Sequence, residues 1–211
     1  SSLIAFNGDS GVWVKNDQDT TSHCHFYNCT VVSNKSHGIY GYGSYNNYLN
    51  NSIVAFNGTS SGNDLYASAR MFLANMCAFG GKSGALGGSA GSYVSDETYL
   101  GVNPLFEGMF RLSSASLCNK RGINHSAHNL LPVDTDVYGE PWNGEYDMGC
   151  FKSEHPLVSI TKHAEVWVST DGDDDNPGNS ADAPLRTLAR ANLVLASGGT
   201  VHVGAGTFAE G

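Results

Sequence analysis

The residues best spaced for binding chemistry form an acidic run, residues 171–182. Oxygen-bearing side chains stand at positions 1, 3, 5, 9 and 12 of this run, as in calcium-binding loops. They are Asp171, Asp173, Asp175, Asn179 and Asp182. Position 6 is Asn176 where such loops have Gly, and position 12 is Asp instead of Glu. The run predicts a solvated acidic turn, with a calcium site as the alternative, and we expect no other cofactor.

Five cysteines are a second set of reactive residues, and their odd number allows at most two internal disulfides. Cys118 and Cys150 bracket a long irregular segment, so they are the pair that we predict to be bonded. The alternative is that the cysteines are small apolar fillers in stacked strands.

Clustered histidines could bind a metal, but each cluster is small. His23 and His25 flank Cys24, and His125 stands three residues before His128. Two ligands without a third are a weak signal for zinc, so we predict no site there.

Aromatic side chains offer a possible contact for sugars. Trp13, Tyr40 and Tyr42, with Tyr45 and Tyr48 nearby, could form a strip that stacks on sugar rings if they are exposed. The alternative is ordinary packing at strands and turns.

Carboxylates do not recur in a pattern that suggests catalysis. Hydrolases need two or three close carboxylates, whereas the acids of residues 1–100 share no column of the repeat described below. We therefore predict no catalytic residue in this segment.

Composition narrows the class of protein. The 211 residues carry a net charge of -9 with only 11 Lys and Arg, which argues against a nucleic-acid-binding surface. No apolar run approaches the roughly 18 residues of a membrane span. The 26 Gly and the low charged fraction of 15% favour short strands joined by turns.

A short phrase recurs along the first half of the chain and predicts the elements that position these residues. Copies begin at residues 1, 28, 51 and 74, and the clearest two read SSLIAFNG and NSIVAFNG. A period in the twenties with a β-branched run before Asn or Gly predicts stacked β coils, a solenoid.

Aligning the copies of the repeat gives columns of equivalent residues. One column contains Leu3, Thr30, Ile53 and Met76. Asn7, Asn34 and Asn57 form another column, in which left-handed backbone and coil-to-coil amide hydrogen bonds are expected.

These residues resemble the right-handed parallel β-helix proteins of bacterial surfaces and secretions, of the pectate-lyase-like and polymorphic outer-membrane-protein-like kind. The coil phrases above carry the resemblance in the first half. Residues 103–151, which include Asp136-Val-Tyr-Gly139 and Asp147-Met-Gly149, look like the stretch that closes such a helix, and we name them the closing segment. Residues 166–206, with Val201-His-Val-Gly-Ala-Gly206, look like an opening one.

The resemblance implies an all-β, right-handed parallel β-helix with one short capping helix near the C-terminal end. We predict coils and closing segment over 1–154, a linker over 155–165, and a cap with the first strand of a following or stacked β-helix over 166–211. The helix is expected over 184–197, capped by Asp182 or Ala183 and ended by Gly198 and Gly199.

The order of these parts suggests how the protein is used, because an opening segment here follows a closing one. The chain is then either a window on a tandem array or one repeat unit that stacks on copies of itself. We expect an extracellular or cell-surface structural or adhesive fibre, with polysaccharide as a second possible partner. The alternative is a carbohydrate-active enzyme, a polysaccharide lyase or glycoside hydrolase, or a carbohydrate-binding β-helix.

Overall fold

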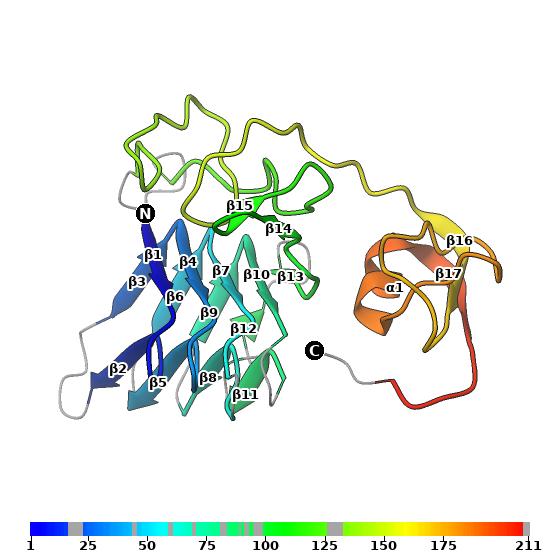
Figure 1. The fold of residues 1–211 in the computed structure, drawn as a ribbon, viewed down its shortest axis with the longest axis horizontal. Coiled ribbons are helices and arrows are strands. Elements are labelled where there is room, and N and C mark those ends of the chain that lie inside the picture. The colour runs from blue at the N-terminus through cyan, green and yellow to red at the C-terminus, as the bar shows by residue number, and fades with distance from the viewer. Residues whose placement is uncertain are drawn as a thin grey trace. The chain divides into compact units, whose positions relative to one another are not determined.

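The computed structural model describes residues 1–16, 23–43, 46–58, 61–68, 71–80, 84–88, 90, 93–94, 99–125 and 133–208. Contacts within the chain define two compact units (Figure 1): unit 1 is Ser1–Val158 and unit 2 is Ser159–Glu210. The division falls inside the linker expected over 155–165. Each unit is described by itself below.

Unit 1 is a parallel β-solenoid, which confirms the predicted fold class. Its strands follow one another through three parallel sheets (Figure 1). Sheet A contains β1 (Ser2–Ala5), β4 (Cys29–Val32), β7 (Ile53–Ala55), β10 (Met76–Phe79) and β13 (Tyr99–Leu100). Sheet B contains β2 (Val12–Asn16), β5 (Ile39–Gly43), β8 (Leu65–Ala67) and β11 (Leu86–Gly88). Sheet C contains β3 (Cys24–Tyr27), β6 (Asn47–Asn50), β9 (Met71–Ala74) and β12 (Tyr93–Val94).

The three sheets enclose one apolar core. Val31 and Val54 of sheet A, Ile39 and Leu65 of sheet B and Leu49 of sheet C are all fully buried and belong to one cluster. Apolar burial of this kind is the main force that holds stacked coils together.

The corners between sheets C and A fix the register of the repeat. Asn28, Asn51 and Asn75 each adopt left-handed backbone there, with φ near 49°, a conformation that Asn tolerates better than most residues. Ile53 lies beside Cys77 in the sheet, so the predicted place of Met76 in that column is wrong by one residue. The fourth repeat begins at Asn75, and the corner residue sets the register.

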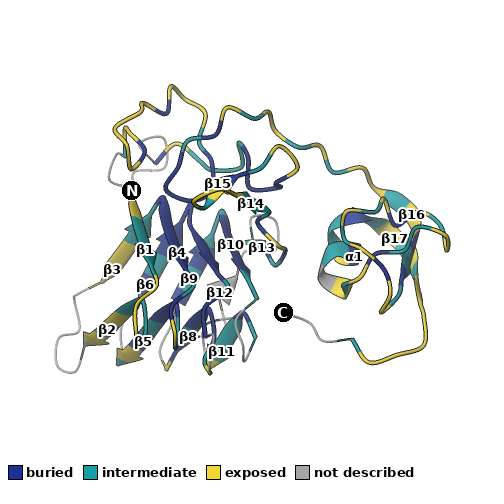
Figure 2. Ribbon diagram, in the orientation of Figure 1, coloured by how far each residue is buried: buried dark blue, intermediate teal, exposed yellow. Residues whose placement is uncertain are grey.

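The closing segment covers the outer face of sheet A. It contains a small antiparallel hairpin of β14 (Phe106–Glu107) and β15 (Arg111–Leu112). The Thr30 hydroxyl accepts a hydrogen bond from the backbone N–H of Cys150, and Asn51 bonds the backbone of Ile123 in both directions. Figure 2 shows the result: the middle strands of sheet A are buried, and all four residues of β4 are buried from both faces.

Unit 2 is a strand–helix–strand unit with its own small core. β16 (His163–Val168) pairs in parallel with β17 (Leu195–Val203), and α1 (Leu188–Val194) packs on them. Val166, Val168, Leu185, Ala191 and Val194 are buried together.

The helix of unit 2 is shorter than predicted. Thr187 caps it by accepting a hydrogen bond from Arg190 N–H, and β17 begins directly after Val194. Leu185, expected within the helix, instead forms a parallel bridge with Val168. The caps predicted at Asp182 or Ala183 and the end predicted at Gly198 are therefore corrected.

Candidate functional site

The end of the solenoid formed by β1, β2 and β3 is open in the described part of the chain. Each of these strands pairs with one neighbour only, β4, β5 and β6 respectively. Ile4, Val12 and Phe26 pack on the core at this end but are only half-buried, and Figure 2 shows the same gradient of exposure. Unpaired parallel edges beside apolar side chains are surfaces that accept further strands.

An asparagine ladder runs to the same end and gives the solenoid a polarity. The Asn34 side-chain oxygen accepts hydrogen bonds from Asn7 N and Nδ2 at 3.0 and 2.8 Å. The Asn57 oxygen accepts from Asn34 N and Nδ2 at 3.1 and 2.8 Å. The predicted amide ladder is thus present, although the left-handed backbone falls one residue earlier, at Phe6, Ser33 and Phe56.

The two ends of this ladder differ. The Asp64 carboxylate accepts from Asn57 N and Nδ2 at 2.8 and 2.9 Å, so it occupies the place of a further asparagine and ends the ladder. At the other end, the Asn7 side-chain oxygen has no donor among the described residues.

Unit 2 also has one covered edge and one open edge. The outer edge of β16 is bonded by surrounding loop: Trp167 N–H donates to Gly178 O, and Leu185 N–H donates to Trp167 O. β17 pairs with β16 alone within the described residues, and Val203 at its end is 51% exposed. β17, whose outer edge is open, therefore runs parallel to its neighbour β16, as the strands of the three solenoid sheets run parallel to theirs.

The predicted sugar-stacking residues lie together on the outer face of sheet B. Trp13, Tyr40 and Tyr66 are adjacent in register, and the two tyrosine rings stack at 5.2 Å with an interplanar angle of 4°. Parallel stacking hides the faces of those rings from any ligand. Trp13 and Tyr42 are 66% and 50% exposed, so they are the ring surfaces that remain free for contact.

The histidines flanking Cys24 take part in a second aromatic ladder, on the outer face of sheet C. His25 stacks on Tyr48 at 4.8 Å, Tyr48 stacks on Phe72 at 4.9 Å, and His23 contacts Tyr48 edge-on. His125 is buried, and its Nε2 hydrogen-bonds Asn51, whereas His128 lies outside the described residues. These contacts assign His23, His25 and His125 to packing.

The acidic run of unit 2 is a turn in the structure. Asp171, Asp173, Asp175 and Asp182 are exposed, and the described residues contain no group of three His, Cys, Asp or Glu placed to hold a metal ion. The carboxylate that makes the most contacts is Asp174, which accepts from Arg186 N, Thr187 N and Thr187 Oγ1 at 2.8–2.9 Å. Calcium binding by the other four stays a prediction.

All five cysteines are free thiols in the structure, and the Cys118–Cys150 bond stays a prediction. The Cys118 thiol lies beside the Cys77 thiol. Cys150 lies beside Thr30, whose hydroxyl accepts from the Cys150 backbone N–H at 3.0 Å, and burial raises the pKa of Cys150 to about 11. Each of the two predicted partners thus has a different neighbour in sheet A, Cys77 for Cys118 and Thr30 for Cys150.

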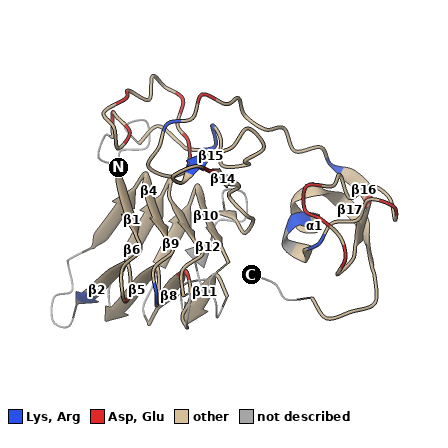
Figure 3. Cartoon of the chain, viewed as in Figure 1, with Lys and Arg blue, Asp and Glu red and all other residues tan. Residues whose placement is uncertain are grey.

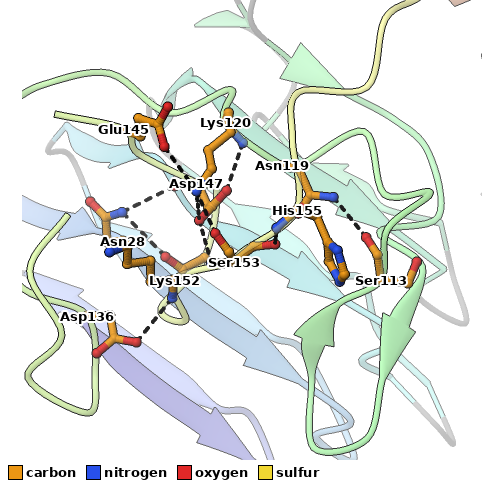
Figure 4. Close-up of polar contacts among 11 residues, drawn as sticks. Asn28, Ser113, Asn119, Lys120, Asp136, Glu145, Asp147, Lys152, Ser153 and His155 are labelled. Atoms are coloured by element: carbon orange, nitrogen blue, oxygen red, sulfur yellow. Dashed lines mark hydrogen bonds and ion pairs between the residues drawn. The ribbon is translucent and has the colours of Figure 1, made fainter. Parts of the chain in front are cut away.

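A buried acid and a lysine hold the last turns of unit 1 (Figure 4). The two oxygens of Asp147 accept from Lys120 N and Ser153 N, each at 2.7 Å, and Lys120 Nζ lies 3.6 Å from the same carboxylate. Burial raises the pKa of Asp147, and the Ser153 and Lys120 hydrogen bonds oppose this shift.

A cavity of about 590 Å³ beside this network is lined by Lys120, Trp142, Tyr146 and His155. The Lys120 ammonium is already occupied, because it also donates to Ser153 O at 2.5 Å and lies 3.7 Å from Glu145. The cavity thus offers no free catalytic base at Lys120, and we assign the network to structure.

Charge on unit 1 is concentrated away from the sheets (Figure 3). The strands of the three sheets carry few charged residues, while the closing segment carries more. No helix in the described part of the chain is long and apolar enough to cross a bilayer.

The carboxylates that matter most were missed by the sequence reasoning. Asp64, Asp147 and Asp174 each accept backbone hydrogen bonds from residues up to 27 positions away. The spacing of acidic residues in the sequence does not indicate which backbone N–H groups a carboxylate will bond. For Asp64 alone, the apolar strand that follows it suggested a buried, structural role.

Comparison with known proteins gives no matching family model, curated protein or solved structure. The class defined by the fold is the parallel β-solenoid, and the function is argued below from the open surfaces.

Proposed function

We propose that this protein is an extracellular or cell-surface structural solenoid that assembles end to end, with unit 2 of one copy docking on the β1–β3 end of another. The observation that carries the proposal is the open end of the solenoid, with its unpaired strands, half-buried core residues and open asparagine ladder. Right-handed winding and kinship with surface β-helix proteins belong to the same proposal.

Unit 2 suits this role because its open strand is of the same kind as the strands of the solenoid. β17 is nine residues long and parallel to β16, so adding a solenoid strand to its free edge would continue a parallel ladder. Such strand addition supplies main-chain hydrogen bonds, while the apolar side chains at the end of the core supply burial.

The test is sedimentation velocity of the full chain over a range of concentrations. We expect species that grow with concentration, and loss of this growth in Ile4→Lys, which places a charge at the open end of the core. Leu86→Lys is the matched control, because Leu86 is equally half-buried against the same core but lies in β11, at the opposite end.

A wild-type chain that stays monomeric at every concentration would contradict the proposal, as would equal effects of the two substitutions. Far-UV circular dichroism of both variants shows that the solenoid remains folded. If unit 2 bound the β1–β3 end of its own chain, the protein would also stay monomeric, and this result would contradict assembly between copies.

Carbohydrate binding is the second candidate, supported by the exposed rings of Trp13 and Tyr42 on one face. A sugar packs its apolar face on such a ring, so Trp13→Ala should abolish retardation in a polysaccharide-containing gel. Equal migration of wild type with and without polysaccharide would remove this candidate.

A further inference from the structure

Four of the five cysteines are buried, and two of them meet across an interface between distant parts of the chain. Cys77 belongs to β10 of sheet A, and Cys118 belongs to the closing segment, 41 residues later. Both side chains are fully buried. The Cys118 thiol lies close enough to the Cys77 thiol to interact with it, and Cys77 Sγ donates to Val102 O at 3.0 Å.

Neighbouring contacts fix the same placement independently of the thiols. Asn75 Nδ2 donates to Arg121 O at 3.2 Å, two residues before Cys77 on one side and three residues after Cys118 on the other. Cys118 O accepts from Met148 N–H, and Gly149 N–H donates to Asn51 O. The closing segment is thus anchored on both sides of the point where the two thiols meet.

We propose that Cys77 and Cys118 form a disulfide that fastens the closing segment to sheet A. The bond would cross-link segments that are held at present by hydrogen bonds and packing, and it would restrict the unfolded chain over a long loop. The inference goes beyond the proposed assembly and does not depend on it. A stable bond would also fit an oxidising compartment.

The chemistry needs an oxidant, for which a small-molecule disulfide such as oxidised glutathione is sufficient. One cysteine thiolate attacks a glutathione sulfur, breaking the S–S bond and releasing one glutathione thiolate. The second cysteine thiolate then attacks the mixed disulfide and releases the other glutathione. Two protein thiols are oxidised, one glutathione disulfide is reduced to two thiols, and the two protons end on the glutathione.

The bond should form before the closing segment has packed. Burial raises the pKa of the Cys77 thiol, so the folded protein holds little thiolate and excludes the oxidant. We therefore expect thiol–disulfide exchange to occur during folding and to be slow in the folded, reduced protein.

The experiment refolds the full, reduced chain in a mixture of reduced and oxidised glutathione. Free thiols are blocked, the protein is digested without reduction, and the peptides are mapped by mass spectrometry. We expect one peptide pair joined through Cys77 and Cys118, with Cys24 alkylated. Recovery of both thiols in alkylated form, or of Cys118 joined to Cys150, would overturn the proposal.

Thermal unfolding gives a second readout. Adding a reductant should lower the unfolding midpoint of the oxidised wild type by about 5 to 10 °C and should not change that of Cys77→Ser. Cys24→Ser is the matched control, because Cys24 is exposed and outside the pair, and it should respond to reductant as the wild type does. If Cys77→Ser fails to fold, the peptide map of the wild type still decides.

Discussion

Single carboxylates in this protein hold turns of backbone together. Asp64 ends the asparagine ladder, Asp147 bonds two backbone N–H groups, and Asp174 bonds the turn before α1. A carboxylate that accepts several backbone hydrogen bonds is a strong structural anchor, since charge-assisted bonds are stronger than neutral ones. The acidic residues of the chain are thus explained more by these turns than by a shared site.

The first prediction concerns Asp147. Asp147→Asn should lower the free energy of unfolding by about 2–4 kcal/mol, because it removes one of two buried acceptors and leaves Lys120 without its buried partner. Urea unfolding at neutral pH measures the loss.

The matched control is Glu145→Gln, which changes the other carboxylate near Lys120. Glu145 is 71% exposed and 3.7 Å from the ammonium, so the expected loss is below about 1 kcal/mol. Similar losses of unfolding free energy in Asp147→Asn and Glu145→Gln would show that the buried contact of Lys120 with Asp147 stabilises the protein no more than its exposed contact with Glu145.

The second prediction concerns pH and His37. Burial lowers the pKa of His37, with Asp9 acting in the opposite direction, and its Nδ1 accepts from Asn63 N–H at 3.0 Å. A lowered pKa in the folded state means stability that is present above the ordinary value of 6.5 and is lost as the pH falls through the folded value.

Thermal unfolding between about pH 7.5 and about pH 5 tests this sign. The midpoint of the wild type should fall on acidification, and His37→Gln should reduce that fall. His25, whose pKa burial and His23 also lower, contributes in the same direction. An unchanged pH profile in His37→Gln would contradict the assignment.

At the scale of elements, the repeat was enough to predict coils but not their outer cover. Asn7, Asn34 and Asn57 carried a visible periodic signal because each does the same task in successive coils. The contacts of the closing segment join residues as far apart as Asn28 and Gly149, and such long-range contacts leave no periodic trace in a single sequence.

Local preference also gave way to tertiary packing at the helix of unit 2. The helix was expected from residue 184, but Leu185 is buried as a bridge beside β16 and α1 begins only at Leu188. Ala191 and Val194 are the helix residues that pack into the core of unit 2. Boundaries of short helices depend on such packing more than on intrinsic preference.

The third prediction tests the asparagine ladder. Asn34→Ala should lower the free energy of unfolding by about 2–4 kcal/mol, because it removes the oxygen that accepts from Asn7 and the amide that donates to Asn57 Oδ1 and Ile4 O. Asn7→Ala, at the exposed end of the same ladder, should cost about 1 kcal/mol or less. Urea unfolding of both compares a buried rung with a terminal one, and equal losses would contradict the ladder as a source of stability.

At the scale of the whole molecule, the proposed assembly uses two of the open parallel edges among the described residues, and the terminal strands β11, β12 and β13 form a further one at the opposite end of the solenoid. The β1–β3 end and the free edge of β17 belong to different units. A chain with two such edges can form open-ended polymers, since each joining step leaves one edge free at each end. The order of the segments in the sequence suggested this use, and under the proposal β17 of one copy meets the β1–β3 end of another.

The most direct test of end-to-end assembly is cross-linking of a mixture of isotopically light and heavy copies of the full chain. A lysine-reactive reagent reports contacts between Lys15 of β2 and Lys162 beside β16, and mass spectrometry distinguishes links within one chain from links between two. We predict Lys15–Lys162 links that join a light peptide to a heavy one. Links confined to single-isotope pairs, or no such link at concentrations where the protein is otherwise cross-linked, would contradict assembly through these edges.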